Sequence, residues 1–311
     1  MGTPVPDAVK TAPATPPASL GSPAIHGRAL ADFATLTKPR VNLLVIFTTF
    51  VGFRLGALEV DVLLLVHALI GTTLVASGAA AINHVLEREI DGRMRRTRSR
   101  PLPDGRLGVT EAAWFAGLLS AAGVVQLALG TNLLAAAVAL VTLASYAFVY
   151  TPLKRVTSLS TVVGAVPGAL PPVIGWTAAT GSLSVEAAIL FAIVFLWQMP
   201  HVLAVSFLYR DDYARGGIRV LPVLEPDGAS TARQSLAYSA ALIPISLLPG
   251  LLGFAGPLYV AGALIAGLAM AACSAEFARS RTITAARRLF LVSLVYLPLL
   301  WVLLLADSIG R

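Results

Sequence analysis

Three side chains that carry oxygen ligands recur at a four-residue spacing in the segment NHVLEREIDGRMRRTRSR, residues 83–100. They are Asn83, Glu87 and Asp91, called the acidic ladder below. On an α-helix each four-residue step rotates by only about 40°, so the three side chains would share one face over about 12 Å. Mg²⁺ is commonly held by one or two carboxylates together with substrate phosphates. The spacing therefore predicts a site for a hard divalent cation.

Arginines follow the acidic ladder directly, at positions 93, 95, 96, 98 and 100. Guanidinium groups are poor partners in a bare metal cage, but they match phosphate oxygens two at a time. Acids and arginines together favour a metal-bridged diphosphate, with Arg96 and Arg100 as its candidate contacts. The alternative is a helix that emerges into water and carries ion pairs at helical spacing, such as Glu89 with Arg93.

Two further segments carry charge beside apolar runs. The segment 197–223 places Asp211 and Asp212 just past the end of an apolar run, and YTPLKR contains Lys154 and Arg155. If these segments lie on the same membrane face as the ladder, their acids and bases can converge on one Mg²⁺–diphosphate site. Lys154 and Arg155 would then neutralise the diphosphate, with Lys154 in a catalytic role.

The composition sets the class of protein that must position these residues. Of 311 residues, 57% are hydrophobic and only 13% are charged, with a mean hydropathy of +0.80, whereas soluble domains carry about 25% charged residues. Apolar runs of about 18 to 22 residues have the length needed to cross a bilayer. The chain is therefore predicted to be an all-α polytopic membrane protein in contact with the lipid bilayer. The net charge of +7 lies in short loops, which argues against a nucleic-acid partner.

The apolar runs predict nine spans. They lie at about 41–58, 62–82, 110–129, 132–150, 160–179, 185–208, 236–254, 257–275 and 289–307. All Lys and Arg residues except Arg54 and Arg311 fall on one side of this arrangement. The positive-inside rule therefore predicts a cytoplasmic N-terminus, cytoplasmic active-site loops and an external C-terminus. Residues 1–30, rich in Pro, Ala, Ser and Thr, are predicted to be a disordered cytoplasmic tail before one transmembrane domain, residues 31–311.

Several motifs together resemble those of a known family. They are N-x-x-x-E-x-x-x-D followed by MRRTRSRPL, then YTPLKR, GAVPGALPP, and WQMPH…RDDY…GGIRVLPV. This series is similar to the UbiA superfamily of intramembrane prenyltransferases. The R-T-x-x-R-P-L and W-Q-M-P-H parts are typical of the subfamily of protohaem IX farnesyltransferases, or haem O synthases. The resemblance extends from residue 36 to about 225 and is patchy beyond.

The resemblance implies nine helices around a central cavity, dependence on Mg²⁺, farnesyl diphosphate as donor and haem b as acceptor. Haem b would be a substrate and not a permanent cofactor, and the product would be haem O with a hydroxyethylfarnesyl side chain. The resemblance also implies a bacterial-type inner cell membrane. A partner that hands over haem, or a haem A synthase partner, follows from the family and from no residue in this chain.

The metal-binding roles carry over by position. Asn83, Glu87 and Asp91 fall on the first metal-binding motif, although the family more often has Asp where Glu87 stands. Asp212 falls on the acid of the second motif. That motif is reduced here, because aromatic prenyltransferases carry a spaced pair of aspartates whereas Tyr213 follows Asp212 directly. The second metal contact is therefore less well supported than the first.

The remaining candidates are substrate contacts. Tyr150, with Tyr146 and Trp197, could shelter a carbocation, although ordinary packing explains such residues equally well. His201 lies inside a predicted span, where ionisable residues are usually functional. The hypothesis is that it contacts haem as an iron ligand or by a hydrogen bond; the alternative is a satisfied core histidine. Lys38 and Arg40 could meet haem propionates, or they could merely set the topology.

Two other functions remain open from the sequence. The first is a prenyltransferase that acts on an aromatic quinone precursor, which would share the ladder and differ in the acceptor pocket. The second is a transporter whose charged loops only set topology. A transporter would be expected to place ionisable groups at the membrane midplane on broken helices. Here the acids cluster at one interface, which favours the enzyme.

Overall fold

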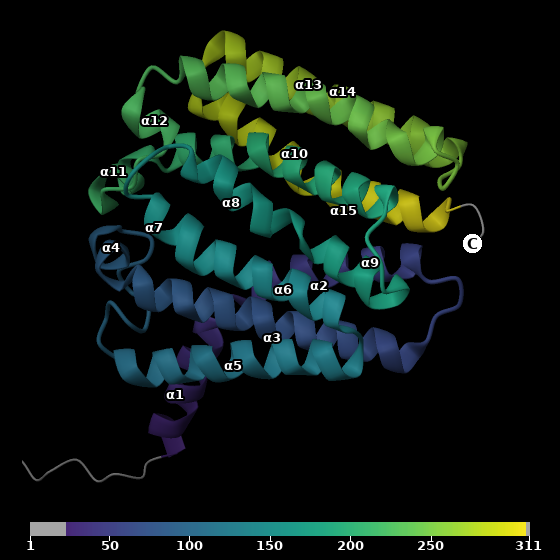
Figure 1. Ribbon diagram of the computed structural model, residues 1–311. Coiled ribbons are helices and arrows are strands. Elements are labelled where there is room, and N and C mark those ends of the chain that lie inside the picture. The colour runs from purple at the N-terminus through teal and green to yellow at the C-terminus, as the bar shows by residue number, and fades with distance from the viewer. Residues whose placement is uncertain (1–22, 309–311) are drawn as a thin grey trace, which may run out of the picture.

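The computed structural model describes residues 23–308, and the regular elements of these residues are all helices (Figure 1). In chain order they are α1 (Pro23–Leu36), α2 (Pro39–Gly56), α3 (Val62–Leu86), α4 (Arg88–Arg93), α5 (Val109–Gly130), α6 (Leu133–Ala144), the π-helix η1 (Ser145–Tyr150), α7 (Thr151–Leu153), α8 (Ser160–Ala169), α9 (Pro171–Thr180), α10 (Val185–Leu208), α11 (Arg210–Gly216), α12 (Leu221–Leu224), α13 (Ala229–Leu251), α14 (Pro257–Ser280) and α15 (Ile283–Ala306). Most of the predicted tail, residues 1–22, lies outside the described part of the chain. The last residues of the range 1–30 belong to α1, for which Pro23 is a favourable first residue.

The expected all-helical membrane fold is confirmed. Eight stretches of the described residues are long and apolar enough to cross a bilayer. They overlap eight of the nine predicted spans, with boundaries that differ by at most about seven residues, the largest difference being the start at Ala229 instead of 236. The remaining predicted span, 41–58, is α2. It is not among the eight, and its 18 residues include the polar side chains Arg40, Asn42 and Arg54. It nevertheless packs inside the bundle against α3, α9 and α15.

Two of the spans are not continuous α-helices. The span 133–153 consists of α6, the π-helix η1 and the short α7, and the span 160–180 is divided into α8 and α9 at Leu170. The division at Leu170 has a local cause, because Pro171 and Pro172 have no backbone N–H to donate to the preceding turn. Both irregular spans line the cavities described below, which is where a membrane protein tolerates such a backbone.

Close approach between helices depends on glycine at a few positions. A Cβ atom on Gly52 of α2 would lie 1.9 Å from the carbonyl oxygen of Pro172, and one on Gly175 of α9 would lie 1.9 Å from that of Thr49. A Cβ on Gly78 of α3 would lie 2.2 Å from Ser120 Oγ of α5. Such contacts are typical of membrane helices, which associate by close packing of small residues. They bring α2 close to α9 and α3 close to α5.

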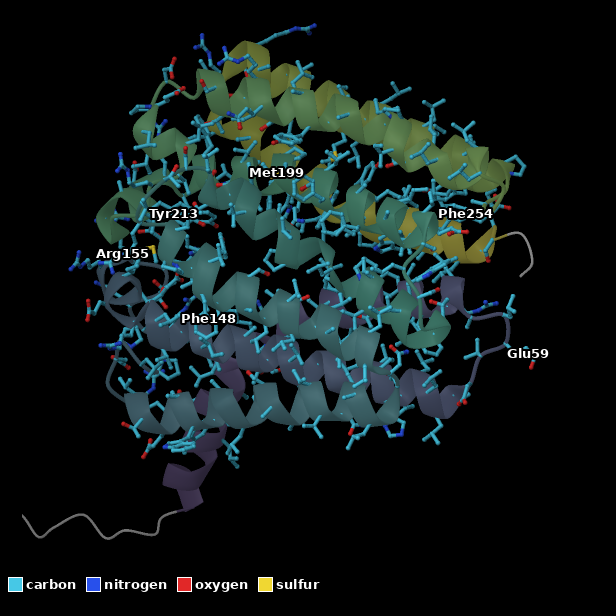
Figure 2. The ribbon with its side chains drawn as sticks, viewed as in Figure 1. Glu59, Phe148, Arg155, Met199, Tyr213 and Phe254 are labelled. Carbon is cyan, nitrogen blue, oxygen red and sulfur yellow. The ribbon has the colours of Figure 1, made fainter. Side chains whose placement is uncertain are left out.

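The charged segments meet at one end of this bundle. The short helices α4, α7, α11 and α12 lie together at the left of Figure 1. Figure 2 shows Tyr213 and Arg155 at that end, whereas Glu59 and Phe254 lie at the opposite end. The backbone joins these segments directly, because the N–H of Arg219 donates to the carbonyl of Lys154 at 2.9 Å. The three charged loops of the sequence therefore form one cap.

Candidate active site

The acidic ladder lies where α3 passes into α4. Glu87 is the joint between the two helices, with φ −98° and ψ 7°. The helical spacing continues through it, since the N–H of Glu87 donates to Asn83 at 2.9 Å and the N–H of Asp91 donates to Glu87 at 2.8 Å. The three side chains are buried and line one cavity of about 220 Å³, called the polar cavity below. They therefore share one face, as their spacing predicts.

Each residue of the ladder accepts a hydrogen bond from a different basic side chain. The pairs are Lys38 Nζ with Asn83 Oδ1 at 2.7 Å, Lys154 Nζ with Glu87 Oε1 at 2.7 Å, and Arg100 Nη1 with Asp91 Oδ2 at 2.7 Å. The three bases come from the α1–α2 junction, the end of α7 and the loop after α4. The tertiary structure thus brings positive charge to each step of the ladder.

The Lys154 side chain is more enclosed than that of Arg100, with exposed fractions of 14% and 28%. Its ammonium lies 4.3 Å from the centre of the Tyr150 ring. Burial acts to lower the pKa of Lys154, but the neighbouring Tyr150 and Glu87 outweigh burial and raise that pKa above its ordinary value. Lys154 is therefore held as a cation beside the ladder.

One oxygen of the ladder has no partner. Asp91 Oδ1 is buried and receives no hydrogen bond from the described residues, an arrangement that is costly unless something else binds there. Among the described residues, no group of three His, Cys, Asp or Glu side chains lies close enough together to hold a metal ion without other ligands. Two carboxylates and an amide with one free oxygen fit Mg²⁺ when phosphate oxygens complete its coordination.

The loop after α4 forms the mouth of the polar cavity. The guanidinium of Arg96 lies 5.0 Å from the ring centre of Tyr209 and 5.8 Å from that of Tyr213. The Thr97 hydroxyl donates to the backbone carbonyl of Asp91 at 2.8 Å. Arg96, Thr97 and Tyr213 all line the polar cavity. Charge–aromatic contacts and a buried hydrogen bond therefore hold this arginine at the entrance.

Asp212 occupies a different position from the ladder. It is buried in the first turn of α11 and is not among the residues that line the polar cavity, although the adjacent Tyr213 is. Its Oδ1 accepts from the backbone N–H of Arg95 at 3.2 Å and forms an ion pair with Arg215. The hydrogen bond from Arg215 is the main cause that lowers the pKa of Asp212. This carboxylate faces protein.

A second, mainly apolar cavity of about 270 Å³ continues from the polar one into the membrane span and is called the apolar cavity below. The two share part of their walls, namely Lys38, Tyr146, Tyr150, Thr161 and Val202. Tyr150 packs so closely on α8 that a Cβ on Gly164 would lie 2.4 Å from its ring. The site is thus an ionic head joined to an apolar pocket.

Several residues predicted from the sequence lie away from both cavities. His201 bonds through Nδ1 to Ser293 Oγ of α15 at 2.8 Å, and its ring lies 5.3 Å from Trp197 and 5.2 Å from Phe290. Arg40 is exposed. Arg155 lines a separate groove outside the polar cavity. Tyr150, in contrast, lines both cavities.

Two further residues of the site were not predicted from the sequence: Thr151, which contacts the ladder from outside both cavities, and Gln198. Asn83 Nδ2 donates to Thr151 Oγ1 at 3.2 Å, which orients the amide. Gln198 lines the apolar cavity and donates from Nε2 to the carbonyl of Ala165 at 2.7 Å. A signal for Gln198 was present, because a glutamine inside an apolar span needs a partner. Thr151 had no comparable signal in its local sequence.

Comparison with known families supports this architecture. Residues 45–303 match the UbiA prenyltransferase family. This match covers most of the chain, so the chain belongs to the UbiA prenyltransferase family. The membrane helices, with an ionic site above an apolar pocket, are the architecture described above.

Individual relatives narrow the comparison. A protein from Solibacter usitatus named protoheme IX farnesyltransferase is 49% identical over 291 residues, which cover 90% of this chain and 100% of the relative. A protein of the same name from Koribacter versatilis is 45% identical over 289 residues, covering 89% of this chain and 93% of the relative. The chain thus spans nearly the whole length of both.

Solved structures share the fold at low sequence identity. A structure described as digeranylgeranylglyceryl phosphate synthase has a TM-score of 0.77 and 18% identity, covering 91% of this chain and 100% of that one. A UbiA homolog from Archaeoglobus fulgidus bound to GPP and Mg²⁺ has a TM-score of 0.63 and 15% identity, covering 88% of this chain and 99% of that one. At these identities the likeness concerns the fold alone.

Proposed function

We propose that this protein transfers a farnesyl group from farnesyl diphosphate to a vinyl group of haem b and releases diphosphate. The observation that carries the proposal is the acidic ladder with its three basic partners at the head of an apolar cavity. The acceptor is inferred from the relatives named protoheme IX farnesyltransferase, which match this chain over nearly their whole length. The product would be haem O.

The polar cavity binds the diphosphate in this proposal. Asn83, Glu87 and Asp91 would hold Mg²⁺, and Mg²⁺ bound there supplies positive charge to the leaving diphosphate. Lys38, Lys154 and Arg100 already lie within hydrogen-bond distance of the ladder, so each can move its hydrogen bonds to phosphate oxygens without a long movement. Arg96 closes the mouth. These residues stabilise negative charge as it develops on the leaving group.

The apolar cavity binds the farnesyl chain. The C1–O bond breaks with its electron pair on the diphosphate, and the allylic cation remains under the rings of Tyr146 and Tyr150. These tyrosines line both cavities and therefore lie beside the junction where the reacting carbon would be bound. The apolar walls exclude water from the cation until the acceptor arrives.

The acceptor step requires no base before its end. The π electrons of a haem vinyl group form the new bond to C1 of the farnesyl group, which leaves a cation on the vinyl carbon next to the porphyrin. Water adds to this carbon and loses a proton, and the result is the hydroxyethylfarnesyl side chain. A contact between His201 and haem stays a prediction, since that side chain is held by Ser293 outside the cavities.

Mass spectrometry of extracted haem tests this function. Purified protein would be incubated with haem b, farnesyl diphosphate and Mg²⁺, and the haem analysed with and without EDTA. The expected result is a mass gain of one farnesyl group plus water that EDTA abolishes. Unchanged haem together with prenylation of an aromatic acid would reassign the acceptor. No transfer to either acceptor would refute the enzymatic proposal.

The proposal includes an orientation in the inner cell membrane, with the ladder on the cytoplasmic side. The arginines of the α4–α5 loop support it through the positive-inside rule. The sole cysteine, Cys273, can be changed to Ala. Each variant then carries a single new cysteine, whose labelling shows on which side of the membrane it lies. With a membrane-impermeant maleimide, Arg98→Cys should be labelled only in inverted vesicles and Ser182→Cys only in right-side-out vesicles. The reverse pattern would overturn the orientation.

A further inference from the structure

The two acidic segments of the cap use their carboxylates differently. Asp91 lines the polar cavity and keeps one buried oxygen without a partner. Asp212 faces the loop after α4, where Oδ1 accepts from the Arg95 N–H at 3.2 Å while Arg215 pairs with the same carboxylate. Its neighbour Asp211 has a side chain that is 87% exposed. Only the first segment therefore presents a free carboxylate oxygen to the cavity.

The contacts of Asp212 hold the backbone of the loop after α4 in place. Met94 packs with Ile90, Ile218 and Val220 in a small apolar cluster that joins α4 to the segment after α11. Residues 95–100 are then held at their start by Asp212 and at their end by the ion pair of Arg100 with Asp91 at 2.7 Å. The loop is thus attached to both acidic segments, and Arg96 lies between the two attachments.

Arg96 is the one basic residue of the polar cavity that has no hydrogen bond with the acidic ladder among the described residues. Lys38, Lys154 and Arg100 each bond to a ladder residue. Arg96 has no carboxylate within ion-pair distance in the described part of the chain, and its guanidinium lies over Tyr209 and Tyr213. Aromatic faces orient a guanidinium without consuming its hydrogen-bond donors, so they remain available to an anion.

We propose that Asp212 is a positioning residue and not a metal ligand. Its hydrogen bond with the backbone N–H of Arg95 holds the loop in place. The guanidinium of Arg96 can then bind the diphosphate where a second metal ion would otherwise be expected. The polar cavity accordingly holds one divalent ion, on the ladder. This inference rests on the proposed diphosphate-binding function and deepens it.

The experiment counts metal ions and measures diphosphate affinity without any prenyl group or haem. Detergent-purified full-length protein would be titrated with inorganic diphosphate and Mn²⁺, with bound Mn²⁺ counted by electron paramagnetic resonance. We expect one Mn²⁺ per chain in the wild type and in Asp212→Asn, with diphosphate bound about 10-fold more weakly by the variant. Arg96→Gln should weaken diphosphate binding about 30-fold, again with one Mn²⁺. Two Mn²⁺ per chain, falling to one in Asp212→Asn, would overturn the inference.

A double variant separates positioning from simple loss of structure. If Asp212 acts through Arg96, the variant Arg96→Gln/Asp212→Asn should bind diphosphate no more weakly than Arg96→Gln alone. Losses that multiply would overturn the positioning role. Asp211→Asn is the matched control, because this acid is adjacent and solvent-exposed; it should bind diphosphate like the wild type. Thermal unfolding of each variant confirms that it is folded.

The outcomes do not depend on the identity of the acceptor. A chain that binds two metal ions and still farnesylates haem b would overturn this inference and leave the proposed function intact. A chain that binds one metal ion but prenylates a different acceptor would support this inference and overturn the proposed acceptor.

Discussion

The two acidic segments, 83–91 and 209–215, look alike in the sequence and differ in the folded protein. Each lies at the end of a long apolar helix, and each has arginines beside its acids. In the first, α3 continues its register into α4, so all three ladder residues face one cavity. In the second, α10 continues through Tyr209 into α11 in the same way, but the residue four positions after this joint is Tyr213, which lines the polar cavity. Asp212 comes one residue earlier and bonds the neighbouring loop. Similar composition therefore does not imply a similar role; the position of the acid on its helix decides which surroundings it meets.

The largest effect is expected at the ladder itself. Asp91→Asn should lower kcat/KM for farnesyl diphosphate about 10³-fold, because it removes a metal ligand and leaves Arg100 without its buried partner. Turnover and Mn²⁺ binding should both fall. The same assay on Asp212→Asn should show a loss of only about 10-fold. Equal losses for the two variants would erase the distinction between the segments.

Lys154 should show the next largest effect. Lys154→Met removes the cation that bonds Glu87 at 2.7 Å, and kcat should fall about 100-fold. Lys154→Arg should recover part of this loss, since it restores the charge without the same geometry. Single-turnover measurement of diphosphate release separates this chemical step from product release. A variant with wild-type release rates would exclude Lys154 from the chemistry.

A smaller effect is expected where the apolar cavity begins. Gly164→Ala would place a Cβ 2.4 Å from the Tyr150 ring, so Tyr150 must move into the space of the farnesyl chain. We expect kcat/KM to fall about 10-fold while inorganic diphosphate binds as before. Gly117→Ala on α5 is the control, since nothing lies within 4 Å of its added Cβ. If diphosphate binding fell as well, the two cavities would not act separately.

The smallest effect concerns pH and Asp212. Its folded-state pKa is lowered, mainly by Arg215, so its contribution to stability is present above the ordinary pKa of about 3.9 and is lost as pH falls through the folded value. The difference in Tm between wild type and Asp212→Asn should thus be constant from pH 7 to about 5 and shrink below about pH 4. A difference that grows in acid would contradict the assignment of the ion pair.

Much of the architecture could be predicted from local patterns. The apolar runs located the membrane-spanning segments, although some boundaries differ by several residues, because crossing hydrocarbon demands a minimum length of apolar helix. The shared face of Asn83, Glu87 and Asp91 followed from helical periodicity alone, since each hydrogen bond in that stretch joins residues four apart.

Contacts between distant segments could not be predicted in the same way. Nothing near Lys38 indicates that its ammonium bonds Asn83, 45 positions away, and the Trp-Gln-Met-Pro-His motif does not say that His201 turns to Ser293 while Gln198 lines the cavity. Which side of a helix meets a neighbour depends on how all the helices pack together.

Local sequence patterns are enough to define the membrane class, the approximate positions of the helices and the spacing of the ladder. These properties depend on interactions within a few residues and on the bilayer as a solvent. The packing of the helices fixes which base meets which acid, that Asp212 faces a loop, and that the polar and apolar cavities share the tyrosine wall of η1. Those properties depend on side chains from different helices that meet only when the bundle packs.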